Sequence, residues 1–337
     1  MIEIKKDFPL KSRNTFGLDV SARYFVEANT PDKISFSINY ASYYNLPVLI
    51  LGGGSNTLFT KNYEGLIIHP SIQGIEVIED QSDYTVIQVG AGVNWDYLVD
   101  WCVTRNLGGI ENLSLIPGDV GASPIQNIGA YGVEAKGTIL KVEGINVITK
   151  KLFELSNAEC KFDYRYSIFK DELKHRVVIT NVQFKLSKNP QLITHYGNLE
   201  EEIEKLGEKS ISTVRQAVIN IRKRKLPDPV ELGNAGSFFK NPLVSLTAFE
   251  EIKKRFDKAP SYPASENSVK VPAGWLIEQC GWKGKQVGNC GVHKDQALVL
   301  VNYGNATGTE ILNLAKQIQK SVHEHFGIDL EMEVNVV

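Results

Sequence analysis

Ser237 presents a hydroxyl in a setting that suits contact with a ligand. It lies in the run Gly233-Asn234-Ala235-Gly236-Ser237-Phe238-Phe239-Lys240-Asn241-Pro242, whose small residues let a backbone approach a bound molecule closely. A hydrolase elbow of the form G-x-S-x-G is absent, because Ala235 and Phe239 occupy its two glycine positions and no histidine stands nearby. The pattern argues against a serine hydrolase, and a surface turn stays an open interpretation.

Two charged side chains also stand in positions that could serve chemistry. Arg165 lies between Tyr164 and Tyr166, where a cation can stack on an aromatic ring. Glu333 lies on the polar face of a strand expected at the C-terminus. A surface stacking contact and a solvated carboxylate are the ordinary interpretations of these two residues.

Metal-ligating patterns are missing from the sequence. The six histidines show no H-E-x-x-H or similar spacing, and the four cysteines are far apart and form no C-x-x-C. We therefore predict no metal, and we interpret the cysteines as reduced thiols, with a pair between Cys280 and Cys290 as the alternative.

Glycine-rich segments in the first half of the chain could hold an anion. Gly52-Gly53-Gly54-Ser55-Asn56 follows the apolar run 48–51, so its amides could form a nest for a phosphate, or simply a turn. Gly90-Ala91-Gly92 precedes a predicted helix, but Trp95 stands where a Rossmann fingerprint needs its third glycine. Residues 113–132 fit neither helix nor strand, which is typical of a long functional loop.

A basic run, Arg222-Lys223-Arg224-Lys225, ends a predicted helix just before Leu226-Pro227-Asp228-Pro229. Cations at a helix C-terminus complement its dipole, so a solvated helix end is one interpretation. The other directs a lysine beside the rigid turn at the diphosphate of a ligand. The two prolines also predict a domain boundary.

Composition limits the class of protein. The chain has 337 residues, 42% hydrophobic and 23% charged, as in a globular protein of two or three domains. A net charge of -2 gives no basic field for nucleic acid. No apolar stretch approaches the roughly 18 residues of a membrane span, and the charged N-terminus lacks the apolar core of a signal peptide. We expect a cytoplasmic protein.

Periodicity predicts the elements that position these residues. Apolar runs predict strands at 48–51, 66–68 and 85–89, and a helix beginning after Asn94 carries buried side chains at helical spacing. A second helix is predicted to begin near Thr213, with Gln216 completing a capping box. A third spans about 308–326, with Thr307 and Glu310 at its start and Gly327 at its end. In the terminal strand, Leu330, Met332, Val334 and Val336 share one face.

Taken in order, the motifs resemble the UDP-N-acetylenolpyruvoylglucosamine reductase (MurB) family over nearly the whole chain. Thr194-His195-Tyr196-Gly197 is similar to the tyrosine-bearing loop of the family's type I branch. The segments that carry the resemblance are Asn14-Thr15-Phe16-Gly17, residues 51–56, 116–132, 164–170 and 225–229, and the run from Gly233 to Pro242.

The resemblance implies an α+β fold. It implies a two-subdomain FAD-binding fold of the vanillyl-alcohol-oxidase type, with residues 1–70 and 71–226 as the subdomains. A third α+β domain, residues 227–327, would bind substrate. The C-terminal strand, residues 328–337, would return to the flavin domains.

The resemblance also implies an activity, that of an NADPH- and FAD-dependent UDP-N-acetylmuramate dehydrogenase in bacterial peptidoglycan synthesis, and hence in cell-wall growth, cell shape and division. Hydride would pass from NADPH to FAD and then to an enolpyruvyl UDP-sugar in ping-pong order. Ser237 would donate the proton, while Arg165 and Glu333 would stabilise the enolic intermediate.

Binding residues follow from the same resemblance. FAD would be held by Gly53, Gly54, Ser55, Asn56, Pro117, Gly118, Ser123, Ile125 and Gly129. The substrate would be contacted by Tyr131, Tyr196, Lys225, Asn241, Tyr262, Lys270 and Gln296. The partners expected are therefore a UDP-sugar and NADPH, for a monomer that binds neither nucleic acid nor membrane.

One residue departs from the family pattern. The last strand of the family commonly reads Pro-Glu-Val-Arg, whereas this chain has Met332-Glu333-Val334-Asn335 and so lacks a cation near the carboxylate. Two other functions stay open at this point. One is a sugar or aldonolactone oxidase on the same flavin fold, and the other is a non-catalytic flavoprotein that binds a UDP-sugar.

Overall fold

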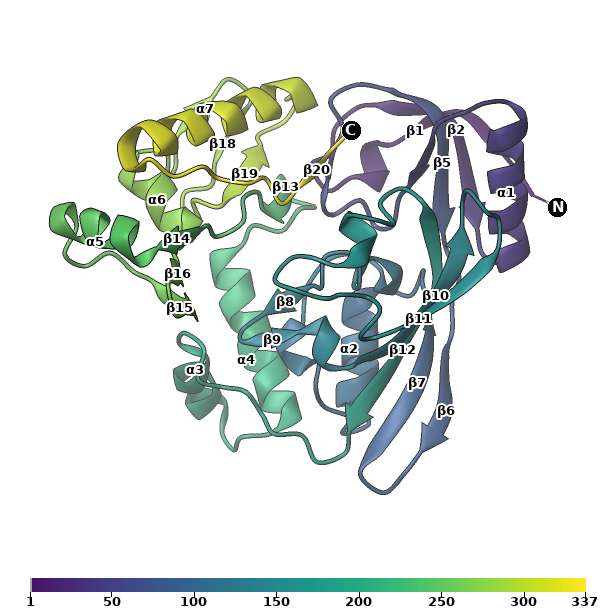
Figure 1. The fold of residues 1–337 in the computed structure, drawn as a ribbon, viewed down its shortest axis with the longest axis horizontal. Helices are drawn as coiled ribbons and strands as arrows, with labels where there is room; N and C mark the ends of the chain where they lie inside the picture. The colour runs from purple at the N-terminus through teal and green to yellow at the C-terminus, as the bar shows by residue number, and fades with distance from the viewer. Residues whose placement is uncertain (1) are drawn as a thin grey trace. The chain divides into compact units, whose positions relative to one another are not determined.

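The chain forms two compact units in a computed structural model that describes residues 2–337 (Figure 1). Unit 1 comprises residues 2–8, Ala22–Gly53 and Tyr63–Arg224, and unit 2 comprises Pro9–Ser21, Gly54–Asn62 and Lys225–Val337. The predicted boundaries at residues 70, 226 and 327 stay predictions. Within residues 2–337, no helix has the length and apolar character needed to cross a membrane.

A four-stranded sheet in unit 1 leads into the first glycine loop. Its order is β1 (Lys5–Pro9), β2 (Ser21–Ala28), β5 (Tyr63–Pro70) and β3 (Val48–Ile50), and β2 and β3 both run parallel to β5. Helix α1 (Pro31–Tyr43) packs Ile34 and Ile38 into the core of this sheet. The strands predicted at 48–51 and 66–68 are confirmed, and β3 ends just before the loop at residues 52–56.

The second sheet of unit 1 is antiparallel. Its order is β11 (Leu152–Ser156), β10 (Ile139–Asn146), β12 (Val177–Ser187), β7 (Tyr84–Gly90) and β6 (Ile75–Asp80). The predicted helix is confirmed as α2 (Trp95–Val103), and the Asn94 side chain accepts a hydrogen bond from the Tyr97 amide at 3.0 Å. Its buried face joins β7 and β12 in one core cluster.

Short elements shape the long loop that the sequence predicted at 113–132. Buried Val120 and Asn127 anchor this loop, so it is ordered without a long helix or strand. The short elements in and around it are η2 (Glu111–Leu113), η3 (Val120–Ala122), β8 (Gly129–Ala130), β9 (Val133–Glu134), η4 (Ala135–Gly137) and η5 (Ile168–Lys170).

Helices α3 (Leu199–Leu206) and α4 (Ile211–Lys225) complete unit 1 and carry the basic run. Helix α4 begins at Ile211, close to the predicted start near Thr213, but the predicted capping box of Thr213 and Gln216 is wrong. The Ser210 hydroxyl accepts from the Thr213 amide at 3.1 Å, and the Thr213 hydroxyl accepts from the Ser210 amide at 2.8 Å. Gln216 instead donates to Asn220 at 2.8 Å. Thr213 therefore completes the cap from inside the helix.

Unit 2 is built on two small antiparallel sheets. The first has the order β13 (Gly233–Ser237), β19 (Val299–Asn302), β18 (Cys290–Val292) and β17 (Gln286–Val287). The second has the order β14 (Leu243–Ser245), β16 (Ser268–Lys270) and β15 (Tyr262–Ser265). The unit also contains η1 (Lys11–Arg13), α5 (Leu246–Arg255) and α6 (Ala273–Gln279). Because β13 lies at an edge of the first sheet, it can accept a further segment beside it.

The last long helix, α7 (Gly308–Phe326), agrees with its prediction. Thr307 and Glu310 form the predicted capping box, and Gly327 ends the helix in the left-handed conformation at φ +67°. The terminal strand is shorter than predicted, since only β20 (Asn335–Val336) is regular and pairs in parallel with β4 (Thr57–Leu58). Leu330 and Val334 are buried, whereas Val336, which was predicted to share their face, is exposed, because the segment changes pairing partner along its length.

An ion pair between α3 and α4 generates a pH prediction. Hydrogen bonds from Arg224, at 2.7 and 3.0 Å, lower the pKa of the buried Glu202 carboxyl to about 2. Glu202→Gln should lower the melting temperature near neutral pH, as followed by circular dichroism. Ionised Glu202 stabilises the fold above its ordinary pKa of 4.5, so the difference between variant and parent should shrink as pH falls from 4.5 towards 2.

The matched control is Glu204→Gln, which removes an exposed carboxylate of the same helix. It should leave the melting temperature unchanged at every pH. A difference for Glu202→Gln that stays constant from neutral pH down to pH 3 would contradict the ion-pair argument.

Candidate active site

Two glycine loops of unit 1 approach each other too closely for side chains between them. A Cβ atom on Gly53 would lie 3.0 Å from the Cα of Gly118, and one on Gly52 would lie 3.5 Å from Oδ2 of Asp119. Gly118 has φ +117°, and its carbonyl accepts the amide of Trp95 at the start of α2 at 2.9 Å. Such bare backbone fits a cofactor that lies against the main chain, so Gly53, Pro117 and Gly118 suit the FAD loops predicted for them.

The rest of the first glycine loop belongs to unit 2 and is tied down on two sides. Gly54 has φ +64°, and a Cβ there would collide with the carbonyl oxygen of Arg13. The Gly54 carbonyl accepts the amide of Thr15 at 3.3 Å. Asn56 donates through Nδ2 to the Glu333 carbonyl at 3.2 Å. The predicted FAD residue Asn56 and the predicted catalytic residue Glu333 therefore lie side by side.

Arg165 is presented by a loop that is fastened to another predicted FAD segment of unit 1. Arg165 has φ +51°, a conformation that a non-glycine residue adopts only when its surroundings impose it. Three hydrogen bonds impose it here: Ser167 Oγ to the Ile125 carbonyl at 2.5 Å, Asn127 Nδ2 to the Asp163 carbonyl at 3.0 Å, and Arg165 Nη2 to the Gly129 carbonyl at 2.7 Å. Asn127 and Ser167 stood inside quoted motifs, but the sequence gave no signal of this positioning role.

Tyr131 and Tyr196, both predicted to contact substrate, are brought together in unit 1. Their ring centroids lie 6.3 Å apart in an edge-to-face arrangement. Nδ2 of the fully buried Asn112 donates to the Tyr131 carbonyl at 2.9 Å and to the Ile193 carbonyl at 2.8 Å. Burial raises the pKa of the Tyr131 phenol, so it stays a neutral hydrogen-bond donor at pH 7. No sequence pattern pointed to Asn112, which connects two segments distant in the chain.

Ser237 and Glu333 are neighbours in unit 2. The Glu333 amide donates to the Phe238 carbonyl at 2.8 Å, and Phe239 forms an antiparallel bridge with Met332. The C-terminal segment thus pairs with the chain directly after Ser237, at the edge where β13 ends. Ser237 is exposed, so its hydroxyl is accessible beside the Glu333 backbone.

A local irregularity positions Ser237. The pairing of β13 with β19 shifts between Asn234 and Ser237, and Gly236 within the shift has φ +67°. The side chain of buried Asn234 accepts the Gly236 amide at 2.9 Å, and the Asn234 amide donates to Thr15 at 3.0 Å. The bulge therefore turns Ser237 outward while its base stays fixed.

Some of the remaining predicted binding residues also form contacts that stabilise the fold. Tyr262 and Lys270 are cross-strand partners between β15 and β16. Asn241 accepts the Ala273 amide at 2.9 Å and so caps α6, while Ser123 donates its buried hydroxyl to Val120 at 2.7 Å. The Oδ1 atom of Asn241 and the hydroxyl of Ser123 therefore already form hydrogen bonds within the protein, and Asn241 keeps its Nδ2 atom for a ligand. Gln296 is half-buried before β19, and Lys225 is exposed at the end of α4.

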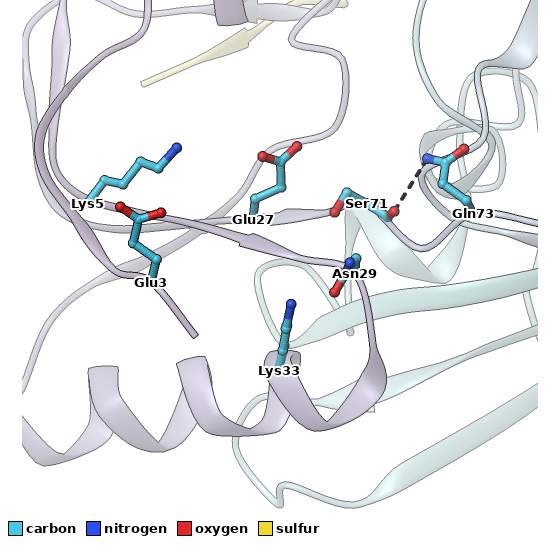
Figure 2. Close-up of a pocket in the computed structure, with 7 residues that line it drawn as sticks. All are labelled: Glu3, Lys5, Glu27, Asn29, Lys33, Ser71 and Gln73. Atoms are coloured by element: carbon cyan, nitrogen blue, oxygen red, sulfur yellow. Dashed lines mark hydrogen bonds between the residues drawn. The ribbon is translucent and has the colours of Figure 1, made fainter. Parts of the chain in front are cut away.

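A polar hollow of about 620 Å³ lies elsewhere on unit 1, where the residues drawn in Figure 2 line it. Lys5, Lys33, Glu3 and Glu27 are among the lining residues, so its charges are mixed. None of the predicted site residues lines this hollow, and nothing in its chemistry connects it to them.

Comparison with known proteins defines the class of this protein. Residues 22–151 match the FAD binding domain, and residues 228–337 match the UDP-N-acetylenolpyruvoylglucosamine reductase C-terminal domain. A crystal structure of MurB from Thermus caldophilus has the same fold, with a TM-score of 0.69 at 22% identity, over 100% of this chain and 98% of that one. The fold and the glycine loops therefore define an FAD-dependent oxidoreductase, and the predicted fold class is confirmed.

Full-length relatives specify the family. UDP-N-acetylenolpyruvoylglucosamine reductase from Flavobacterium johnsoniae is 49% identical over 100% of both chains. The protein of that name from Bacteroides fragilis is 47% identical over 99% of this chain and 100% of its own. The chain belongs to the UDP-N-acetylenolpyruvoylglucosamine reductase family, which confirms the resemblance inferred from its motifs.

The close approach of the two glycine loops generates a prediction. Gly53→Ala would place a methyl group 3.0 Å from Gly118 and push the loops apart, so we expect FAD to bind at least tenfold more weakly. Titration of the apoprotein with FAD, followed by flavin fluorescence, measures the dissociation constant.

Gly137→Ala is the matched control, because a Cβ at Gly137 meets no atom within 4 Å. It should bind FAD as the parent does. Equal affinity of Gly53→Ala and the parent would remove Gly53 from the cofactor site.

Proposed function

We propose that this protein reduces the enolpyruvyl group of a UDP-N-acetylglucosamine derivative to give UDP-N-acetylmuramate, with NADPH as the electron source and FAD as the bound cofactor. One observation carries the proposal beyond family membership. The backbone of Glu333 pairs with the chain beside Ser237 on one side and with Asn56 of the glycine loop on the other. A proton donor, a carboxyl group and a cofactor loop thereby meet within unit 2.

The reaction sets clear demands on the protein. FAD, when bound, would supply the hydride chemistry that links NADPH to the terminal carbon of the enol ether. Negative charge then develops on the adjacent carbon and spreads onto the substrate carboxylate. The chain must therefore supply a proton to that carbon and favourable electrostatics to the carboxylate.

Ser237 is assigned the proton transfer. A neutral hydroxyl is a weak acid, but the carbanion-like carbon is a strong base, so the transfer is favourable once the two atoms are close. The exposed position of Ser237 after the bulge at Gly236 supports access to a substrate.

Arg165 and Glu333 are assigned the stabilisation of the developing charge. A guanidinium can bind a carboxylate through two parallel hydrogen bonds, and it keeps its charge at any physiological pH. The strained backbone of Arg165, held through Ile125, Gly129 and Asp163, supports a fixed orientation of this cation. Glu333, when protonated, could donate a hydrogen bond to the same carboxylate.

The substrate nucleotide is assigned to the residues that the family resemblance indicated. The aromatic pair of Tyr131 and Tyr196 and the cross-strand pair of Tyr262 and Lys270 combine flat surfaces with polar tips, which suits a nucleotide sugar. Lys225, Asn241 and Gln296 complete the proposed set. Family membership, together with the bond between the Glu333 amide and the Phe238 carbonyl next to Ser237, favours the reductase over the oxidase and the non-catalytic alternatives.

A test separates the two half-reactions. Ser237→Ala should slow reoxidation of the flavin by the enolpyruvyl substrate roughly 10²–10⁴-fold, because the proton donor is lost, while NADPH still reduces the flavin at the parental rate. Anaerobic stopped-flow absorbance measures both rates on the FAD-loaded protein.

The control Ser82→Ala removes an exposed hydroxyl from a turn in unit 1 and should change neither rate. Equal slowing of both half-reactions in Ser237→Ala would argue against the assigned proton transfer. A parent flavin that stays reduced until air enters would instead support an oxidase.

We also propose that the protein works as a monomer in the cytoplasm. Its four cysteines are free thiols, which suits a reducing compartment. Sedimentation of the FAD-loaded protein should give a mass near 37.5 kDa at micromolar concentration, and a mass twice as large would refute the monomer.

A further inference from the structure

Arg222 differs from the other members of the basic run on α4. Lys223, Arg224 and Lys225 are exposed, whereas Arg222 is half-buried. Its Nε atom is fully buried and has no hydrogen-bond partner among residues 2–337. Arg224, by contrast, forms two hydrogen bonds with Glu202. The position of Arg222 is therefore not explained by a solvated helix end.

The surroundings of Arg222 belong to the proposed substrate site. Tyr131 packs against the apolar face of α4, in the cluster that contains Val218 and Ile221. The phenol of Tyr131 and the carboxylate of Asp96 are the groups that interact electrostatically with the Arg222 guanidinium. Lys225, another proposed substrate residue, follows Arg222 by three positions and so lies on the same side of the helix.

The neighbouring carboxylate is already engaged. Asp96 accepts hydrogen bonds from Arg215 at 2.7 and 3.2 Å and from the Leu115 amide at 2.6 Å. These three bonds occupy both of its oxygens, and no ion pair joins Asp96 to Arg222 within residues 2–337. Within the described part of the chain, the guanidinium of Arg222 therefore has no carboxylate paired with it.

A cation in this position has an energetic cost. Burial lowers the pKa of Arg222 from its ordinary value, because its charge is poorly solvated. A buried charge without a partner destabilises a fold, so its presence calls for a compensating role. An anionic ligand that arrives beside Tyr131 would supply the missing partner.

We propose that Arg222 is an anion-binding residue of the nucleotide site, where its guanidinium binds phosphate oxygens of the ligand that lies against Tyr131. The inference rests on the proposed function for the location of the ligand. Apart from the diphosphate of FAD, which is already bound in the FAD-loaded protein, two ligands of that function carry phosphate, the UDP-sugar and NADPH. A guanidinium suits either, since its fork of N–H donors matches the spacing of phosphate oxygens.

The test compares ligands with and without phosphate on the FAD-loaded protein. Arg222→Met keeps the length of the side chain and removes its charge and its donors. Calorimetric titration should show UDP, NADP⁺ or both binding about 10–100-fold more weakly, as expected for the loss of charged hydrogen bonds. Uridine, which has no phosphate, should bind within about twofold of its parental affinity.

The two phosphate sources are distinguished by the same titrations. A loss for UDP alone assigns Arg222 to the diphosphate of the sugar nucleotide, and a loss for NADP⁺ alone assigns it to the phosphates of NADPH. Arg222→Lys, which retains the charge but not the fork, should give an intermediate loss. Lys223→Met, the matched control on the exposed side of α4, should bind all three ligands as the parent does.

A stability measurement separates ligand binding from a structural role. Because no carboxylate among residues 2–337 pairs with Arg222, Arg222→Met should melt at the same temperature as the parent or higher when no nucleotide is present. Unchanged affinity for both UDP and NADP⁺ would overturn the inference. So would a lower melting temperature with equal weakening of uridine, UDP and NADP⁺. Failure of the parent itself to bind either nucleotide would refute the proposed function instead.

Discussion

The candidate site depends on one constraint, the hydrogen bonding of the C-terminal segment along both of its edges. The Glu333 amide binds the Phe238 carbonyl, and the Glu333 carbonyl accepts from Asn56. A single residue of the C-terminal segment is thus held between the chain that follows Ser237 and the glycine loop. Both bonds are made by the main-chain amide and carbonyl of Glu333, so they fix the point from which its carboxyl group extends. Movement of any one of the three segments would displace the other two.

In unit 1, short polar side chains hold irregular backbone segments in place through hydrogen bonds. Asn127 and Ser167 fasten the loop of Arg165, and Asn112 fastens Tyr131 to the segment before Tyr196. These loops have few regular neighbours, so their backbone groups need side-chain partners. Such an arrangement holds Arg165 and Tyr131 in fixed positions on loops.

Asn335, which stands where the family commonly has an arginine, forms two hydrogen bonds in this structure. Its amide and its Nδ2 donate to the Asn56 carbonyl at 3.0 and 3.1 Å, so the residue fastens β20 to the glycine loop. An arginine at this position would carry a charge that this chain lacks. The unusual residue therefore holds the backbone of the glycine loop at Asn56 through two hydrogen bonds.

The sequence by itself determined the long, strongly periodic elements and the family. The apolar spacing after Asn94 and the capping box at Thr307 were enough for α2 and α7, because each signal is local and satisfied within one helix. Local signals failed at Thr213, where a serine three residues earlier competes for the same cap, and at Val336, where the strand changes partners. Only the tertiary structure decided that Glu333 adjoins Ser237, that Arg165 rests on Gly129, and that Arg222 has no paired carboxylate among residues 2–337. These facts depend on hydrogen bonds and burial between segments distant in the chain, which no pattern of neighbouring residues encodes.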